Sequence, residues 1–550
     1  MTYTIPHHLR RHRLTLALLS SALFATPALA ISEDAKVVLQ LLVTKGVITQ
    51  KDYDDTISAL ESKPSEGVPP VQFVQDALGV KATDVQKSVE YTQKDEKKGS
   101  VAPGGFGLLS ADAQHSVNLT GMVHYDYRNI TSGLPASKDK DSASSADTFS
   151  FRRTRIGVNG YVYKDIEYEL IVNATGSDTN IMDTGFINFA SNKDAQVKVG
   201  RFRQPYSLES MTKDGSIDFM ERSYGDQLGP QKLLGAMVGG EPKKGFTYGA
   251  SYAQAGFNEL TNSDSAGGLV TGRVTANFGE LANLNNKVIH FGVSTNRGRY
   301  EVLPATSTDT GSTSASSTTQ TRATLLSYRS ENQGMANAYR AQIGGDKVNT
   351  GYGIAANNVA TVDKGLNNLE FAVTNGAVKF QYEAASLTLD ASAPNITTAG
   401  TPGVTTTASL SLNSKTQYYE VFYNLTGESW ADAYKGGSFT GIKPNSNYVF
   451  GKGGTGAWQL GIRVSQYKAS LPGFVTIASD GGNNGSRAEN SEKAKTTTYG
   501  LNWILNPNSR VMFNYATTQF DRPVYLLSST DTSSRSSREN IFSIRTQINF

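Results

Sequence analysis

The chain has 550 residues, 18% of them charged, with 53 Gly, 26 Tyr, 23 Phe and no Cys. This composition excludes a long coiled coil and a charged disordered chain, and the lack of Cys excludes disulfide frameworks and thiolate metal sites. The formal net charge is only +3, and the sequence has no run of about 18 apolar residues, which excludes a bundle of transmembrane helices.

Residues 1–30 have the features of a secretory signal peptide. Three arginines precede an apolar run, 14–24, and a small-x-small cleavage pattern follows at 28–30, so we expect Ile31 to be the first mature residue. The alternative, an uncleaved membrane anchor, is disfavoured because the apolar run is about half as long as a membrane span. Cleavage leaves 49 basic and 49 acidic residues, so a preference for anions has to come from where the charges lie.

Residues 31–100 are predicted to form a helical periplasmic extension that ends in a linker. Apolar residues recur at helical spacing near its start, and prolines then interrupt the pattern before a charged and Gly-rich stretch. No residue of this segment suggests chemistry. A solvated extension and an oligomerising helical segment both remain open.

From about His115 onward, apolar and polar residues alternate with a period of two. Val117, Leu119 and Val123, for example, share one face of the first such segment. The segments are separated alternately by short turns and by long polar stretches. The tight turns are predicted at 375–376, 413–414 and 506–508, and the long loops at 129–148, 300–365, 390–403 and 469–495.

This asymmetry predicts an all-β fold, a transmembrane antiparallel β-barrel over residues 101–550 with about 16 strands and up to 18 candidates. Short turns are expected on the periplasmic side and long loops outside. A secreted β-sandwich or β-helix is the soluble alternative, but a sandwich has no reason to keep its long loops at one end. The last strand, with Phe542, Ile544, Ile548 and the terminal Phe550 on one face, is typical of outer-membrane barrels.

Several motifs in the barrel region together resemble the phosphate-selective porin O/P family. They are the stretch 151–158, FRRTRIGV; the stretch 199–202, VGRF; the stretch 425–429, LTGES; and the hairpin 500–515, GLNWILNPNSRVMFNY. The resemblance implies a homotrimer of sixteen-stranded barrels, each with a third outer loop folded into the pore. The long 300–365 segment and the high strand count depart from that pattern.

Strand phase assigns charged residues to the barrel interior, because the apolar faces have to meet lipid. The basic residues in inward phase are Arg128, Arg153, Arg155, Lys198, Arg273, Lys379, Arg463, Arg510 and Arg545. The acidic ones are Asp126, Glu167, Glu169, Glu370, Glu383 and Glu420. This basic excess favours anions. In the alternative, the arginines only brace the wall, with Arg153 and Arg155 pairing with Glu167 and Glu169.

The inward loop is expected at about 203–233 and carries charges of both signs. Phase places Arg201 and Arg203 on the lipid side unless the strand ends or bulges near Gly200, so both stay open, with salt bridges to the wall as the alternative role. The anion-pathway candidates are Arg153, Arg155, Lys198, Arg201, Arg203, Lys213, Arg222, Arg273, Lys379 and Arg463.

The predicted function is passive diffusion of anions, with phosphate or polyphosphate as first candidates, through a water-filled channel in the bacterial outer membrane. Arg and Lys can replace the water that a narrow pore strips from an oxyanion. The alternatives are a weakly selective general porin and a structural or receptor barrel. An enzyme is not expected, because beyond the signal peptide only His115, His124 and His290 remain and no nucleophile motif occurs. No cofactor, metal or nucleic acid is expected. The expected partners are phosphate-like anions and outer-membrane lipid.

Overall fold

The computed structural model describes most of the chain from residue 106 onward. The described residues are Gln50 and Asp54 and the ranges 106–110, 112–131, 145–175, 181–255, 267–284, 286–302, 305–308, 319–334, 337–345, 352–354, 360–398, 405–470, 491–525 and 535–550. The predicted signal peptide and nearly all of the predicted helical extension lie outside them. No helix among the described residues is long and apolar enough to cross a membrane.

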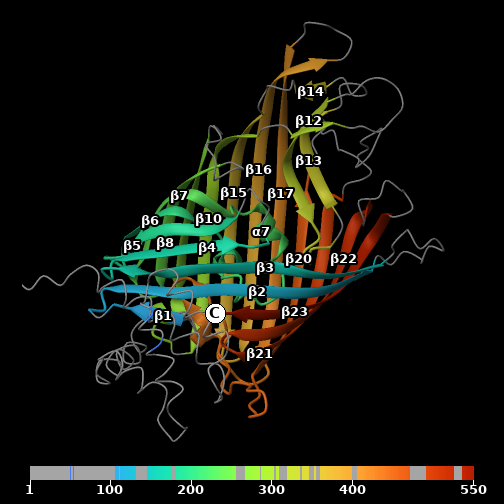
Figure 1. Ribbon diagram of the computed structural model, residues 1–550. Coiled ribbons are helices and arrows are strands. Elements are labelled where there is room, and N and C mark those ends of the chain that lie inside the picture. Colours follow the sequence, from blue (N-terminus) through green and yellow to red (C-terminus); the bar gives the residue numbers. More distant parts are fainter. Residues whose placement is uncertain are drawn as a thin grey trace, which may run out of the picture. The chain divides into compact units, whose positions relative to one another are not determined.

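Sixteen antiparallel strands form a closed ring in which β23 pairs with β2 (Figure 1). This confirms the predicted all-β barrel. The strands of the ring are β2 (His115–Thr131), β3 (Ser145–Val162), β4 (Ile166–Asn173), β5 (Met182–Phe189), β6 (Gln196–Arg203), β7 (Lys232–Lys243), β8 (Phe246–Gln254), β9 (Gly268–Asn277), β10 (Lys287–Val302), β15 (Ala360–Asn375), β16 (Val378–Thr398), β17 (Thr405–Asn424), β20 (Ala457–Ala469), β21 (Lys493–Asn506), β22 (Ser509–Tyr525) and β23 (Arg535–Asn549).

The remaining elements are short and lie beside the ring or between its strands. Strand β1 pairs with β2, and β14 pairs with β16. Strands β11, β12 and β13 form one small sheet, and β18 and β19 form another. Their bounds are β1 (Phe106–Leu109), β11 (Ala305–Thr308), β12 (Thr319–Arg329), β13 (Asn337–Gly345), β14 (Tyr352–Ile354), β18 (Tyr434–Lys435) and β19 (Ser438–Phe439). The helices are α6 (Leu208–Met211), α7 (Tyr224–Leu228), α8 (Phe278–Leu281) and the 3-10 turn η1 (Ala431–Ala433).

Alternation along the strands separates a lipid face from an interior face. In β17, Tyr419, Val421 and Tyr423 are exposed, whereas Glu420 and Phe422 between them are buried. The apolar side chains meet the membrane and the polar ones are turned inward, as a barrel in lipid requires.

The ring closes where the last residue meets β2. The backbone N–H of Gly121 donates to the carbonyl of Phe550 at 2.7 Å, and the N–H of Phe550 donates back to Gly121 at 3.1 Å. A Cβ at position 121 would lie 2.3 Å from the Phe550 ring, so only glycine leaves room for the terminal aromatic residue.

Three segments that connect strands fold against the interior face. We call 204–231 the constriction loop, 319–345 the outer insert and 425–456 the inner insert. The outer insert enters from the end with the long loops. The inner insert lies at the opposite end, beside the tight turn at 376.

Three sequence predictions about the loops are wrong. The stretch 390–403, predicted as a long loop, is mostly strand, because β16 continues to Thr398. Asn413 and Ser414, predicted as a tight turn, lie inside β17 and pair with Thr388 and Leu387 of β16. These two strands continue beyond their neighbours, as Figure 1 shows, because Leu387, Leu389 and Leu412 are buried against the outer insert and so hold the hairpin together. The long connections are also not confined to one end, since the inner insert lies at the end with the short turns.

Candidate functional site

Backbone amides of the constriction loop hold it to β16 on the interior wall of the barrel. The N–H groups of Leu208 and Glu209 donate to the Glu383 carboxylate at 3.0 and 2.7 Å, and Ser207 caps the short helix α6 by accepting from Ser210 N–H at 3.0 Å. At the next turn Tyr224 N–H donates to Glu331 of the outer insert at 3.0 Å. The loop is therefore fixed at both of its helical turns.

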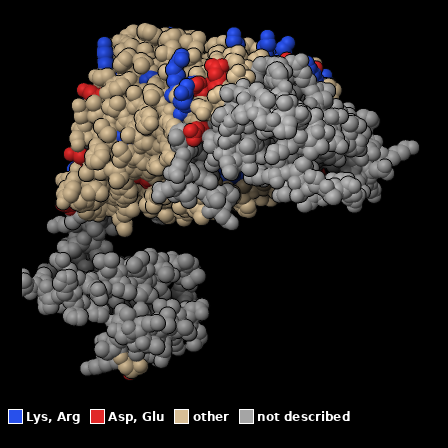
Figure 2. All heavy atoms as spheres, turned by 90° about the horizontal axis from the view of Figure 1, so that it is seen from above, with Lys and Arg blue, Asp and Glu red and all other residues tan. Residues whose placement is uncertain are grey.

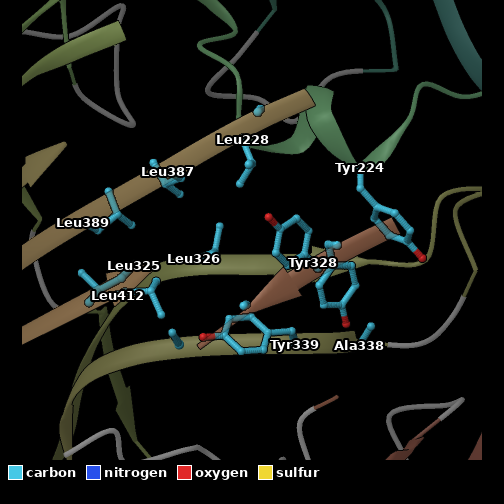
Figure 3. Packing of buried hydrophobic residues seen from close by; sticks show 14 of the residues in the cluster. Tyr224, Leu228, Leu325, Leu326, Tyr328, Ala338, Tyr339, Leu387, Leu389 and Leu412 are labelled. Atoms are coloured by element: carbon cyan, nitrogen blue, oxygen red, sulfur yellow. The ribbon is translucent and has the colours of Figure 1, made fainter. Parts of the chain in front are cut away.

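Aromatic packing joins the loop to the outer insert. The rings of Tyr328 and Tyr467 stack with centroids 4.2 Å apart, and Tyr224 meets Tyr467 edge-on at 4.9 Å. Tyr224 also meets Tyr328 edge-on, with ring centroids 6.0 Å apart, and Figure 3 shows both residues in one buried cluster with Leu228. Offset and edge-on rings of this kind stabilise a contact beyond the burial of their area.

Three of the candidate cations are deeply buried on the interior faces of β9, β16 and β20. Arg273 donates twice to Glu370, at 2.8 and 3.1 Å, and also to the Gly437 carbonyl of the inner insert at 2.7 Å. Arg463 forms ion pairs with Glu209 at 3.1 Å and Glu331 at 3.2 Å.

Lys379 pairs with Glu420 at 2.9 Å and with Asp218 of the loop, and it lies 4.7 Å from the ring centroid of Trp430. These three cations connect the loop and both inserts to the wall.

Two carboxylates of the constriction loop, Asp214 and Glu221, each form ion pairs with several arginines. Asp214 pairs with four arginines, at distances that include 3.4 Å to Arg153 and 3.6 Å to Arg203; the other two are Arg155 and Arg222. Glu221 pairs with Arg152 and Arg545, each at 2.9 Å, and with Arg128 at 3.1 Å.

The arginines control the ionisation of both carboxylates. Burial by itself would raise the pKa of Asp214 and Glu221, but the surrounding guanidinium groups outweigh it and hold both pKa values well below the ordinary range. Both groups are therefore charged at neutral pH, and cations outnumber anions around them.

The charged side chains of this cluster differ in how much of their surface is exposed to water. The side chains of Arg152, Arg155, Arg203 and Lys232 are 14% to 29% exposed. Their partners Asp183, Asp214 and Glu221 are 4% to 10% exposed, and only Asp226, at 16%, is as open as the cations. Within this cluster the cations are therefore more exposed to water than most of the carboxylates that pair with them.

A β-bulge accounts for Arg152, which strand phase had not placed inside the barrel. The pairing of β2 with β3 shifts between His124–Arg153 and Tyr125–Phe151, so Arg152 has no partner in the ladder. A bulge re-aims the side chain that it frees. Here Arg152 reaches Glu221 with two hydrogen bonds, at 2.9 and 3.1 Å.

The structure also settles where Arg203 lies. Gly200 has a φ of 124°, a conformation that favours glycine, and β6 runs on to Arg203. Arg203 contacts the loop, donating to Ser210 Oγ at 3.1 Å and pairing with Asp214 and Asp226. Arg201 is partly exposed between Gly185 and Leu234 of the neighbouring strands.

Two lysines complete the water-accessible side. Lys198 lies 4.3 Å from the ring centroid of Phe186, and Lys213 is exposed on the loop. Among the described residues neither has an ion-pair partner. The Glu167 and Glu169 pairs expected for Arg153 and Arg155 do not form; Glu167 instead accepts from Asn188 at 2.8 Å.

Sequence reasoning counted Lys232 among the charges of the inward loop but not among the pathway candidates, and it missed Arg152 and the entire inner insert. The doubled arginine after Phe151 was the available signal for the bulge, since strict alternation gives Arg152 and Arg153 opposite faces. The inner insert carried no such signal, because its contacts are with residues far away in the sequence. No cluster of metal-ligating side chains occurs in the described part of the chain.

The sequence of the barrel is similar to that of known proteins. The family model for phosphate-selective porins O and P matches residues 117–550. The chain belongs to this family. It is 24% identical to Porin O of Pseudomonas aeruginosa over 433 residues, which are 76% of this chain and 86% of that protein. The protein is thus an outer-membrane porin, a channel of the bacterial outer membrane.

Solved structures with a similar course of the chain include two other outer-membrane proteins. Vibrio cholerae OmpT shares 15% identity over 80% of this chain and 99% of its own, with a TM-score of 0.42. The outer membrane channel DcaP of Acinetobacter baumannii shares 11% identity over 81% of this chain and 99% of its own, with a TM-score of 0.40.

Proposed function

We propose that this porin conducts anions in preference to cations, with phosphate-like oxyanions as its substrate class. The observation that carries the proposal is the layered charge beside the constriction loop, where partly exposed cations stand in front of more deeply buried carboxylates. A solute in the pore meets the front layer first. Arg offers a planar fork of donors and Lys a compact charge, and both suit an oxyanion that has lost part of its water.

Depth divides the ten candidate cations into two roles. Arg155, Lys198, Arg203 and Lys213 are accessible and are assigned to the pathway, together with Arg152 and Lys232. Arg153, Arg222, Arg273, Lys379 and Arg463 are buried in ion pairs and are assigned to holding the loop and the inserts in place. Arg201 is partly exposed and stays a candidate for the pathway.

For an anion to pass through the pore, no single contact with the cations of the pathway can be strong. The carboxylates behind the front layer satisfy part of each guanidinium, so an anion finds several partial partners in sequence rather than one deep site. Such a series favours conduction, because binding has to be weak enough for release. The description of the family as phosphate-selective porins supports phosphate as the solute class.

The double variant Lys198→Gln/Lys213→Gln tests the proposal most cleanly, because it removes two pathway charges and leaves no described carboxylate without its partner. One charge about 4 Å from a passing ion contributes about 1 kcal/mol in water, so we expect the anion-to-cation permeability ratio to fall about fivefold for each lysine. Phosphate block of the chloride current should weaken in parallel. Both quantities are measured in planar bilayers.

The matched control is Arg297→Gln/Arg299→Gln, two charges on the outward face of β10. It should leave the permeability ratio unchanged. An unchanged ratio in the lysine variant, with an intact barrel, would remove these residues from the pathway. A wild-type channel without ion preference would favour the general porin instead.

A further inference from the structure

A row of lysines crosses the outward face of three neighbouring strands. Lys415 of β17 lies directly opposite Lys468 of β20, and Lys468 lies opposite Lys493 of β21. All three are exposed, and Lys495 stands one outward position further along β21. Figure 2 shows Lys and Arg side chains that stand out from a mostly uncharged surface, with some Asp and Glu side chains among them.

This arrangement is unfavourable for the isolated protein. Like charges directly opposite each other in neighbouring strands destabilise a sheet. In the described part of the chain, none of these four lysines has an ion-pair partner. The nearby Asp521 is already engaged, because it accepts from Ser491 Oγ at 2.5 Å and from Lys493 N–H at 3.1 Å. Asp521 still supplies only one negative charge against four lysines, so the described residues leave the row with a net positive charge.

The surface around the row is shaped to receive a ligand. A hollow of about 630 Å³ is lined by the four lysines and Asp521. The remaining outward-facing lining residues are amides, namely Gln417, Gln466 and Gln519. Ammonium groups flanked by amides match a ligand that carries phosphate groups next to hydroxyls, because the amides can both donate to and accept from the hydroxyls.

The position of the row along β21 places it at a membrane interface. Trp503 stacks on Trp458 with ring centroids 5.2 Å apart, as in the aromatic girdles of such barrels. Lys493 lies on the same outward face of β21, ten residues before Trp503 in the sequence. Ten residues span about 34 Å along a strand, or about 25 Å along the membrane normal at a tilt of about 40°. The apolar band of an outer-membrane barrel is also about 25 Å tall.

The row therefore lies at the headgroup level of the leaflet beside the long loops. In the outer membrane this is the outer leaflet, since the long loops of such barrels are extracellular. A free phosphate would be held poorly on this open, screened surface, whereas a lipid is supplied by the membrane itself.

We propose that this row binds the phosphate groups of a glycolipid of the outer leaflet. Lys415, Lys468 and Lys493 contact the phosphates, and the glutamines with Lys495 contact the sugar. The lipid neutralises the row and so stabilises this part of the wall. The site is separate from the pore, so it stands independently of the ion preference proposed above.

The test uses the full-length porin, freed of lipid in mild detergent and titrated with a glycolipid that carries two phosphate groups, lipid A. Binding is measured by native mass spectrometry. We expect Lys468→Gln/Lys493→Gln to weaken binding about thirtyfold, since each surface lysine contributes about fivefold toward an anionic headgroup. Lys468→Arg/Lys493→Arg keeps the charge and should retain binding.

The matched control is Lys243→Gln/Lys244→Gln, which removes two exposed lysines at the end with the short turns and should bind like the wild type. Dephosphorylated glycolipid should bind the wild type as weakly as the glutamine variant binds the intact lipid. Equal binding by all variants would overturn the proposal. So would a change of oligomeric state in the glutamine variant with unchanged lipid binding, which would assign the row to a contact between subunits.

Discussion

At the scale of single residues, the depth of a charge inside the barrel decides what it can do. Arg463 and Lys379 are almost fully buried, and each is surrounded by carboxylates of the wall and of the inserted segments. Removing one partner of such a pair leaves a buried charge uncompensated, at a cost of about 3–5 kcal/mol. Arg152 and Lys232, by contrast, keep part of their surface in water and can exchange a partner for a passing ion.

Glu209 of the constriction loop provides a pH-dependent prediction. Burial raises its pKa to about 8, and Arg463, which opposes this shift, does not cancel it. Because the pKa is raised above the ordinary value of 4.5, the stabilisation from the bound proton is full at low pH and is lost as the pH rises through about 8. Above that pH the loop gains a negative charge beside the pathway.

We therefore expect the anion preference of the wild type to fall between pH of about 7 and about 9, and the preference of Glu209→Gln to fall less over this range. Asp214 and Glu221 add no such dependence, because both are already ionised. Reversal potentials recorded at the two pH values measure this directly. The same pH dependence in variant and wild type would show that another group titrates.

At the scale of elements, the inner insert is the least expected part of the structure. Trp430 is buried between Phe422 and Phe439, with ring centroids 6.1 and 5.9 Å away. His290 of β10 meets Tyr434 of the insert, with 2.7 Å between Nδ1 and the phenol oxygen. The insert thus covers part of the pore at the end with the short turns.

Trp430→Ala should loosen this cover. Truncating a buried tryptophan costs about 3–5 kcal/mol, enough to release a short segment while the hydrogen-bonded ring persists. We expect a larger single-channel conductance with the ion preference unchanged, because the pathway charges lie elsewhere. Phe450→Ala is the control, since Phe450 is in the same insert but 90% exposed. Wild-type conductance in both variants would exclude the insert from the conduction path.

At the scale of the whole molecule, the sequence predicts the features that depend on residues close together in the chain. Period-two alternation predicted the barrel, with up to 18 candidate strands, and the inward phase of residues such as Arg545 and Glu370, because each strand has to put one face in lipid. The number sixteen was implied by the family resemblance. The Arg152 bulge and the two inserts depend on contacts between distant residues, so no local pattern predicted them. Asn413 and Ser414 have turn propensity, but packing against the outer insert outweighs it. The homotrimer stays a prediction.

The central claim is that the front layer of cations makes this porin selective for anions. The most direct test is the reversal potential of the wild-type channel in a planar bilayer under a chloride salt gradient, followed by addition of phosphate. We predict a potential with the sign set by chloride and a chloride current that phosphate reduces, more strongly at low salt because screening is weaker there. A potential with the sign set by the cation would contradict the account.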